Sequence, residues 1–348
     1  MNKRYNFADV IKFLFAGLII MSHYASEWGS FNKKIDMFFS LYIVVVPFFF
    51  VSSSFFVFRK FNSVQNKEER KSIIIKYIKR IAVMYLSWSC IYILFNVLTW
   101  CVYGVKLSEI AAYVHELVVY SSYNTIWFLP ATAIGVAMVY LFSRYLSIRQ
   151  MIAVALIFYI IGCIGHSYNF VLDRFFVLGK IYEIYNNIFL TTRNGVFNGF
   201  PFAAIGYVIA LNSKDENKGF YNKNLILSGI FLLAFVFEAV FIKKFFSAIN
   251  ANTILFLFPF SYYFYKWVLG IELKDRKIFL TFRKLSTVMF LSQRIFLTAL
   301  PVLLPESFFR NILINNSYIG LIYILSITIL FSFILVKLSK YKLIKLFV

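Results

Sequence analysis

The segment FADVIKFLFAGLIIMSHYASE, residues 7–27, has the length and apolar content of a membrane-spanning helix. A helix needs about 20 residues to cross the hydrocarbon core of a bilayer. Four ionisable residues nevertheless lie in this run or at its edges: Asp9, Lys12, His23 and Glu27. Because such side chains are costly against lipid, they are expected to face a cavity or a partner helix.

The composition is that of a protein built largely inside a membrane. Hydrophobic residues make up 61% of the 348 residues and aromatic residues 21%, whereas charged residues make up 15%. In a soluble domain, by comparison, about a quarter of the residues are charged. The balance therefore predicts a polytopic membrane protein.

The cysteines do not suggest a shared site. Cys90, Cys101 and Cys163 each lie in or beside an apolar segment. This placement favours neither a disulfide framework nor a clustered metal site. We therefore expect no metal.

Apolar runs long enough to span a bilayer occur along the whole chain, so the sequence predicts an all-α integral membrane protein with about ten transmembrane helices. Residues 1–348 are expected to form a single transmembrane domain with no appended soluble domain. The predicted spans lie near residues 7–27, 37–58, 80–103, 124–143, 150–172, 195–212, 224–242, 252–270, 284–303 and 316–337.

Positive charge is distributed unevenly between the two sides of this predicted bundle. Most of the 36 lysine and arginine residues lie in the two tails and in the loops on the same side as the tails. The positive-inside rule therefore predicts that both termini are cytoplasmic. The net charge of +21 then reflects topology and contact with anionic membrane lipids. It disfavours nucleic acid as a partner, which would require a soluble basic face.

Spacing places the ionisable residues of the first span on one face. Lys12 and His23 are eleven residues apart, which on an α-helix is about three turns, ~16 Å of rise and only about 20° of rotation. Asp9 precedes Lys12 by three residues and Glu27 follows His23 by four, so each pair can also meet along that face. A stripe of ionisable groups is therefore expected along most of the span.

The arrangement Asp-x-x-Lys, ten residues, His resembles the opening of the membrane-bound acyltransferase-3 family. In that family the first helix carries D-x-x-R or D-x-x-K with a histidine at this spacing, and the histidine is the proposed catalytic residue. Here the basic position is Lys12 rather than the commoner arginine. A lysine keeps the positive charge but cannot form a bidentate hydrogen-bonded contact with a phosphate or carboxylate.

The resemblance continues along all ten predicted spans, and it includes departures. Ser54 stands where the second helix of the family usually has glycine, and one of the paired arginines that precede the third helix is absent. Gln293 stands where many relatives have histidine. The segments that carry the resemblance are VPFFFVSSSFFVFRK (46–60), YIKRIAVMYLSWS (77–89), NTIWFLPATAIG (124–135), TTRNGVFNGFPFAAIGYVIA (191–210) and LSTVMFLSQRIFLTALP (285–301).

The resemblance implies transfer of an acyl group to a hydroxyl, which requires a base. Neutral histidine suits that role because its unperturbed pKa lies near 6.5, so His23 is the expected base. Glu27 could fix the tautomer and stabilise the imidazolium, as carboxylates do in catalytic triads. Glu27 could equally be an interfacial acid that meets water.

An acyl-CoA donor, expected to be acetyl-CoA, would present its phosphates on the cytoplasmic side. The cations predicted there are Lys12, Lys76, Lys79 and Arg80. For Lys76 and Lys79 the positive-inside rule is a sufficient alternative explanation. Lys12, inside a span, and Arg80, at a helix start, are the stronger candidates for donor binding.

The expected acceptor is a hydroxyl of a cell-surface or lipid-linked saccharide. Trp127, Arg193 and Asn194 match family positions and are candidate substrate-binding residues. The outer loop at 173–194 is rich in aromatic and amide groups, which suit a sugar but would also suit an interfacial helix. Glu238 and Arg294, each inside a predicted span, could pair with one another.

Depth in the membrane separates the two ends of the stripe. If the first helix enters near Phe7, Lys12 lies about 8 Å deep and His23 about 24 Å deep in a core about 30 Å thick. We therefore expect the donor to reach His23 through an internal channel in a bacterial plasma membrane. The alternative is a transporter or permease for a small solute such as an amino acid, because buried ionisable residues suit that function as well. A scaffold without chemistry fits the His23 and Lys12 stripe least.

Overall fold

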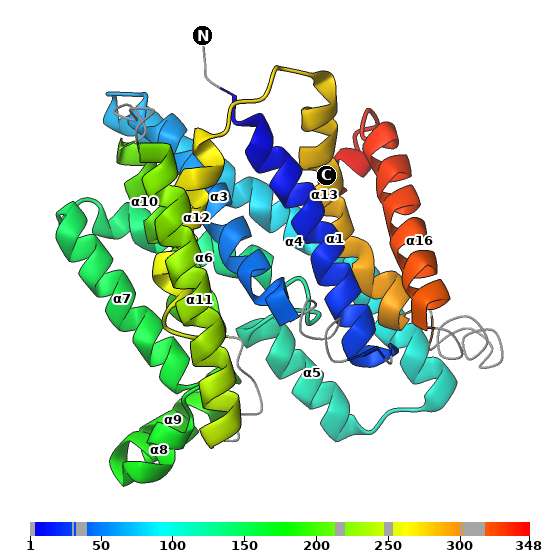
Figure 1. The fold of residues 1–348 in the computed structure, drawn as a ribbon. Helices are drawn as coiled ribbons and strands as arrows, with labels where there is room; N and C mark the ends of the chain where they lie inside the picture. The colour runs from blue at the N-terminus through cyan, green and yellow to red at the C-terminus, as the bar shows by residue number, and fades with distance from the viewer. Residues whose placement is uncertain are drawn as a thin grey trace. The chain divides into compact units, whose positions relative to one another are not determined.

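The computed structural model describes residues 4–29, 31–32, 40–212, 220–246, 253–299, 301 and 317–348. Within these residues the protein is helical throughout and contains no strand, as predicted (Figure 1). The principal α-helices are α1 (Asn6–Glu27), α3 (Val45–Asn62), α4 (Lys67–Tyr103), α5 (Leu107–Val119), α6 (Phe128–Phe142), α7 (Ile148–Ile164), α8 (Phe170–Arg174), α9 (Phe176–Phe189), α10 (Phe200–Asn212), α11 (Phe220–Phe246), α12 (Leu257–Gly270), α13 (Lys277–Arg294) and α16 (Ser317–Leu338). Short 3₁₀ segments, η1 (Ser40–Val44) and η5 (Ile344–Phe347), and π-helical segments, η2 (Gly195–Gly199) and η3 (Ile295–Ala299), complete the described part.

Every apolar run singled out in the sequence contains a helix. Among the described residues, 6 helices are long and apolar enough to cross a membrane by length and composition. They are Asn6–Glu27, Leu41–Asn62, Lys67–Tyr103, Gly195–Asn212, Tyr221–Phe246 and Ser317–Leu338. The apolar helices α6 and α7 are shorter, so the multi-pass architecture is confirmed, while the count of ten spans and the cytoplasmic termini stay predictions.

Helix α4 is longer than the predicted third span. It begins at Lys67 and continues without a break to Tyr103, over 37 residues. The charged connector KEERK at its start consists of good helix formers, so the helix extends through the connector into the apolar run.

The described chain divides into two compact units. Unit 1 comprises Met1–Val45, Val83–Ile126 and Glu272–Val348, and unit 2 comprises Val46–Ala82 and Trp127–Ile271. In unit 1, α1 packs along α13, and α16 packs against both, so that the three helices lie side by side (Figure 1). Phe13 of α1 and Phe282 of α13 stack with ring centroids 4.8 Å apart. This pairing of first and ninth predicted spans places their polar residues opposite one another.

Unit 2 is built around α10, which packs against α6, α7 and α12, while α11 packs on α12. Close helix approach depends on two glycines: a Cβ on Gly199 would clash with the Ala131 carbonyl of α6, and one on Gly206 with the Val51 carbonyl of α3. Small residues at such crossings are typical of membrane helices. The family-like glycine pattern of residues 191–210 therefore has a packing role.

The outer loop predicted at 173–194 forms helix α9, which has no buried residue. Phe176, Ile181 and Ile184 are exposed on it, while the Tyr182 hydroxyl donates a hydrogen bond to the Gly165 carbonyl. An amphipathic helix with an exposed apolar side favours the interfacial-helix interpretation over a sugar site.

Candidate active site

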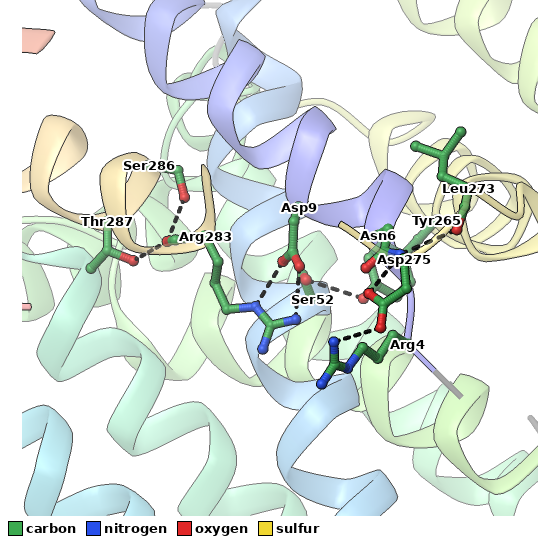
Figure 2. Close-up of polar contacts among 10 residues, drawn as sticks. All are labelled: Arg4, Asn6, Asp9, Ser52, Tyr265, Leu273, Asp275, Arg283, Ser286 and Thr287. Atoms are coloured by element: carbon green, nitrogen blue, oxygen red, sulfur yellow. Dashed lines mark hydrogen bonds and ion pairs between the residues drawn. The ribbon is translucent and has the colours of Figure 1, made fainter. Parts of the chain in front are cut away.

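The N-terminal part of α1 is held to α13 by an ion pair. Arg283 donates from Nε to Asp9 Oδ1 at 2.8 Å and from Nη2 to Asp9 Oδ2 at 2.7 Å (Figure 2). The Asp9 side chain is 1% exposed and that of Arg283 43%. A two-point guanidinium–carboxylate contact fixes orientation as well as distance, so it sets the register of α1 against α13.

Further contacts anchor the same end of α1. Asn6 Nδ2 donates to the Leu273 carbonyl at 3.2 Å and to Asp275 Oδ1 at 3.3 Å, and Arg4 Nη1 lies 2.6 Å from Asp275 Oδ2 (Figure 2). Leu273 and Asp275 belong to the segment that precedes α13. The first turn of α1 is therefore tied to the start of α13.

Lys12 lies one turn after Asp9 on α1 and is buried. Asp9, three residues earlier, has both carboxylate oxygens engaged by Arg283. One buried carboxylate, Asp9, and two cations, Lys12 and Arg283, leave a net positive charge at this end of α1 and α13. Such an end suits an anionic group of a substrate.

At the other end of α1, His23 contacts Gln293. His23 Nδ1 lies 2.9 Å from Gln293 Oε1, and Gln293 Nε2 donates to the Phe290 carbonyl at 2.9 Å. Gln293 is fully buried, whereas His23 is partly exposed. The edge of the His23 ring also faces Tyr42, with centroids 6.1 Å apart. The histidine is therefore held by neighbours and still accessible.

Glu27 forms an ion pair with Arg294. Arg294 Nη1 contacts Glu27 Oε1, and Arg294 Nε donates to Thr125 Oγ1 at 3.1 Å. The Glu27 side chain is 25% exposed and the Arg294 side chain 10%. A carboxylate neutralised in this way stabilises a neighbouring imidazolium less than a free one would, and the residue hydrogen-bonded to His23 Nδ1 is Gln293.

Arg294 and Glu238, considered as partners in the sequence, each have other contacts. Glu238 belongs to unit 2, where it accepts hydrogen bonds from the Tyr168 hydroxyl and from the N–H groups of Leu255 and Phe256. The two backbone bonds measure 2.7 and 2.8 Å. Glu238 thus satisfies backbone donors at the start of α12 and has a structural role.

A hydroxyl pair lies beside Arg294. Tyr123 Oη and Thr298 Oγ1 are 2.7 Å apart, and Thr298 Oγ1 donates to the Arg294 carbonyl at 2.8 Å. Burial raises the pKa of Tyr123, with the Thr298 hydrogen bond and Arg294 opposing that shift. The phenol is therefore protonated at neutral pH, and the end of unit 1 that holds His23 offers hydroxyl groups as well as charge.

In unit 2 the structure brings Trp127 and Arg193 together. The Arg193 guanidinium carbon lies 5.1 Å from the centroid of the Trp127 ring, a cation–π distance. Asn194 has different contacts: its Oδ1 accepts from the N–H groups of Val196 and Phe197, and its Nδ2 donates to the Tyr185 hydroxyl. The Asn194 amide therefore caps η2, whereas the half-buried Arg193 packs over the buried Trp127 ring.

The candidate donor-binding cations divide between the units. Lys76, Lys79 and Arg80 are exposed on α4 in unit 2, and Lys12 is buried in unit 1. Among the described residues, no group of three or more histidine, cysteine or acidic side chains could hold a metal ion.

Comparison with known proteins shows which family the chain belongs to. A family described as an acyltransferase domain matches residues 5–337. The chain belongs to the acyltransferase-3 family. This family member is also similar to two proteins of Enterococcus faecalis that are named amino-acid racemase. It is 28% identical to one over 237 residues, which are 67% of this chain and 32% of the racemase. The second is 24% identical over 250 residues, 70% of this chain and 34% of the racemase.

The chain spans about a third of the length of these curated relatives. No solved structure matches it. The family assignment therefore rests on the acyltransferase-domain match, which covers nearly the whole of this chain, and the multi-pass helical architecture agrees with it.

Three residues of this acyltransferase-3 protein were not assigned to the site from sequence. Arg283 lies just before the predicted span 284–303, and Arg294 was considered only as a possible partner of Glu238. Gln293 was noted only as a departure from the histidine of many relatives. For Arg294 and Gln293 the available signal was an ionisable or amide side chain inside the apolar run 284–303, the same signal that singled out His23, whereas Arg283 lies just before that run.

Proposed function

We propose that this protein transfers an acetyl group from acetyl-CoA, bound from the cytoplasmic side, to a hydroxyl of a cell-surface or lipid-linked saccharide, with His23 as the base. The family match supports acyl transfer. The observation that carries the proposal concerns His23, which lies on the same face of α1 as Lys12. His23 is partly exposed, and its Nδ1 contacts the buried amide of Gln293.

The chemistry requires one proton carrier. A nitrogen of His23 takes the proton of the acceptor hydroxyl as the oxygen forms a bond to the thioester carbonyl carbon. The carbon–sulfur bond then breaks, and the coenzyme A sulfur leaves with the proton that the imidazolium returns. The net change is one ester formed and one thioester broken.

The remaining residues have proposed binding roles. Lys12 and Arg80, with Lys76 and Lys79, attract the phosphates of the donor, and Trp127 and Arg193 contact the saccharide. Glu27, paired with Arg294, helps to form the region around His23 where the acceptor binds. The charges of this ion pair also contribute to the electrostatic potential at His23. Asn194 supports this surface through the cap that it forms on η2.

The test uses the purified chain in detergent or nanodiscs with radiolabelled acetyl-CoA. We expect slow hydrolysis of the thioester without an acceptor and transfer of label to a saccharide fraction when membranes that contain glycans are added. If acetyl-CoA is never consumed under either condition, the acyltransferase proposal fails.

A second candidate, transport of a small solute such as an amino acid, has one observation in its favour. The two curated relatives are named for a reaction on amino acids. Reconstituted vesicles that take up an amino acid in a His23-dependent way, with acetyl-CoA not consumed, would replace the first proposal with this one.

A further inference from the structure

A fully buried amide on α13 decides which nitrogen of His23 carries the proton. Gln293 makes two side-chain contacts, one from Nε2 to the Phe290 carbonyl and one from Oε1 to His23 Nδ1, both at 2.9 Å. Neither Gln293 nor Phe290 is exposed, so water does not compete for these positions.

The Phe290 carbonyl sets the orientation of the amide. A carbonyl oxygen can only accept, so the NH₂ group of Gln293 must turn toward it. In the reversed orientation two acceptor oxygens would face one another at hydrogen-bond distance in a buried site, which proteins avoid. Oε1 is therefore the atom that faces His23.

The orientation of the amide then fixes the imidazole. Because Oε1 can only accept, Nδ1 of His23 must donate, and in a neutral imidazole the lone pair is then on Nε2. We propose that Gln293 is a positioning residue that holds neutral His23 in the Nδ1-protonated tautomer and thereby presents Nε2 as the base. The tautomer is a property of the resting protein, whereas the role of Nε2 as a base rests on the proposed function.

An amide has an advantage over a charged partner at this position. A carboxylate would accept the same Nδ1–H, but it would also stabilise the imidazolium and keep the proton on the ring at higher pH. Gln293 accepts the Nδ1–H and orients the ring without placing a negative charge beside it.

The other titratable groups near His23 come from several elements. Glu27 lies on α1, Tyr42 on η1, Arg294 on α13, and Tyr123 precedes α6. Helix α16, which also packs on α1, carries Tyr318 and Tyr323 but no charged residue before Lys337. Glu27 and Arg294 are paired, so substitution of Gln293 is the direct way to change the charge next to His23.

The resting protein tests the tautomer without any assay of activity. The full-length chain is labelled with ¹⁵N-histidine, and the His23 resonances are assigned as those lost in His23→Ala. At a pH where the ring is neutral we expect Nδ1 to resonate as a protonated nitrogen and Nε2 as an unprotonated one. In Gln293→Leu we expect the Nε2-protonated form to appear as well. A wild-type spectrum with the proton on Nε2 overturns the inference.

Two substitutions connect the tautomer to catalysis. Gln293→Leu keeps the approximate volume and removes the acceptor, and we expect kcat to fall about 10–100-fold, as for other partners that orient a functional histidine. Gln293→Glu restores the acceptor, so we expect it to recover activity at high pH, with the acidic limb of the pH–rate profile moved to higher pH. Ser292→Ala is the matched control, since that buried hydroxyl has no hydrogen-bond partner among the described residues.

Each outcome decides a separate question. Unchanged nitrogen shifts and an unchanged pH profile in both Gln293 variants would overturn the positioning role. Equal losses in Gln293→Leu, Gln293→Glu and Ser292→Ala would show that only packing was disturbed, which also overturns it. A tautomer that depends on Gln293 in a protein that transfers no acetyl group would support the inference and refute the proposed function.

Discussion

The carboxylate of Asp9 on α1 is buried against the guanidinium of Arg283 on α13, with contacts of 2.8 and 2.7 Å. The pair is asymmetric, because Asp9 is 1% exposed and Arg283 43%. Removing Arg283 would take from the buried Asp9 carboxylate the donors that engage both of its oxygens, whereas removing the anion would leave a cation that can reach water or lipid headgroups.

We therefore expect Arg283→Gln to destabilise the protein by about 3–5 kcal/mol and Asp9→Asn by about 1–3 kcal/mol. Thermal unfolding of the purified variants in detergent measures both. The exposed Arg4–Asp275 pair, with side chains 55% and 54% exposed, provides the control: Asp275→Asn should cost less than about 1 kcal/mol. Equal losses in all three variants would contradict a stabilising role specific to the buried pair.

His23→Ala should abolish ester formation while expression and unfolding temperature stay at wild-type values. Loss of a general base typically costs about 10²–10⁴ in rate. Transfer of acetyl label to cell glycans measures the effect. His166→Ala is the control, because His166 follows α7 in unit 2 and lies outside the proposed chemistry. Wild-type acetylation by His23→Ala would rule out the assigned base.

Lys12→Ala and Arg80→Ala should each raise the KM for acetyl-CoA by about tenfold or more, since a charge-assisted hydrogen bond to phosphate is lost. The KM for the acceptor should change little. Lys106→Ala serves as the comparison, because Lys106 precedes α5 and is predicted to lie on the outer side. A similar rise in all three variants would indicate general destabilisation rather than donor binding.

Arg193→Ala and Asn194→Ala should have different effects although the residues are adjacent. Loss of the Arg193 guanidinium from the Trp127 ring should raise the KM for the acceptor with little change in stability. Loss of the Asn194 cap on η2 should cost about 1 kcal/mol of stability. Steady-state kinetics and thermal unfolding separate the two effects. A rise in the KM for the acceptor that occurs only in Asn194→Ala would reverse the roles assigned to Arg193 and Asn194.

The topology can be tested by labelling single cysteines in a chain whose native cysteines are replaced, since Cys90 and Cys101 are exposed. We expect Lys106→Cys to react with a membrane-impermeant maleimide added to intact cells and Lys274→Cys to be protected until the cells are opened. Lys274 lies between α12 and α13. Its labelling from outside would invert the predicted orientation.

Helix positions could be predicted from the sequence because each depends on a local property. The run 7–27 matches α1 (Asn6–Glu27) closely, since an apolar stretch of this length has few alternatives. The extension of α4 to Lys67 was missed because hydropathy identifies the apolar part of a helix and not its charged continuation.

The partners of the ionisable residues could not be predicted in the same way. Asp9 and Arg283 are 274 residues apart, and Glu27 and Arg294 are 267 apart, so their meeting depends on how α1 packs along α13. The stripe on α1 was predictable from helical periodicity, but nothing local distinguishes Glu27 from Gln293 as the residue that contacts His23.

The π-helical segment η3 (Ile295–Ala299) directly follows the residues that contact His23 and Glu27. A π turn is equivalent to a single inserted residue in an otherwise regular helix. Its removal by deleting one residue would leave Gln293 and Arg294 in place but rotate everything after it by about 100°. Leu297, whose carbonyl accepts from Trp28, and Thr298, which contacts Tyr123, would then turn away. Chain length at this single point, and not only residue identity, therefore controls which groups surround the C-terminal end of α1.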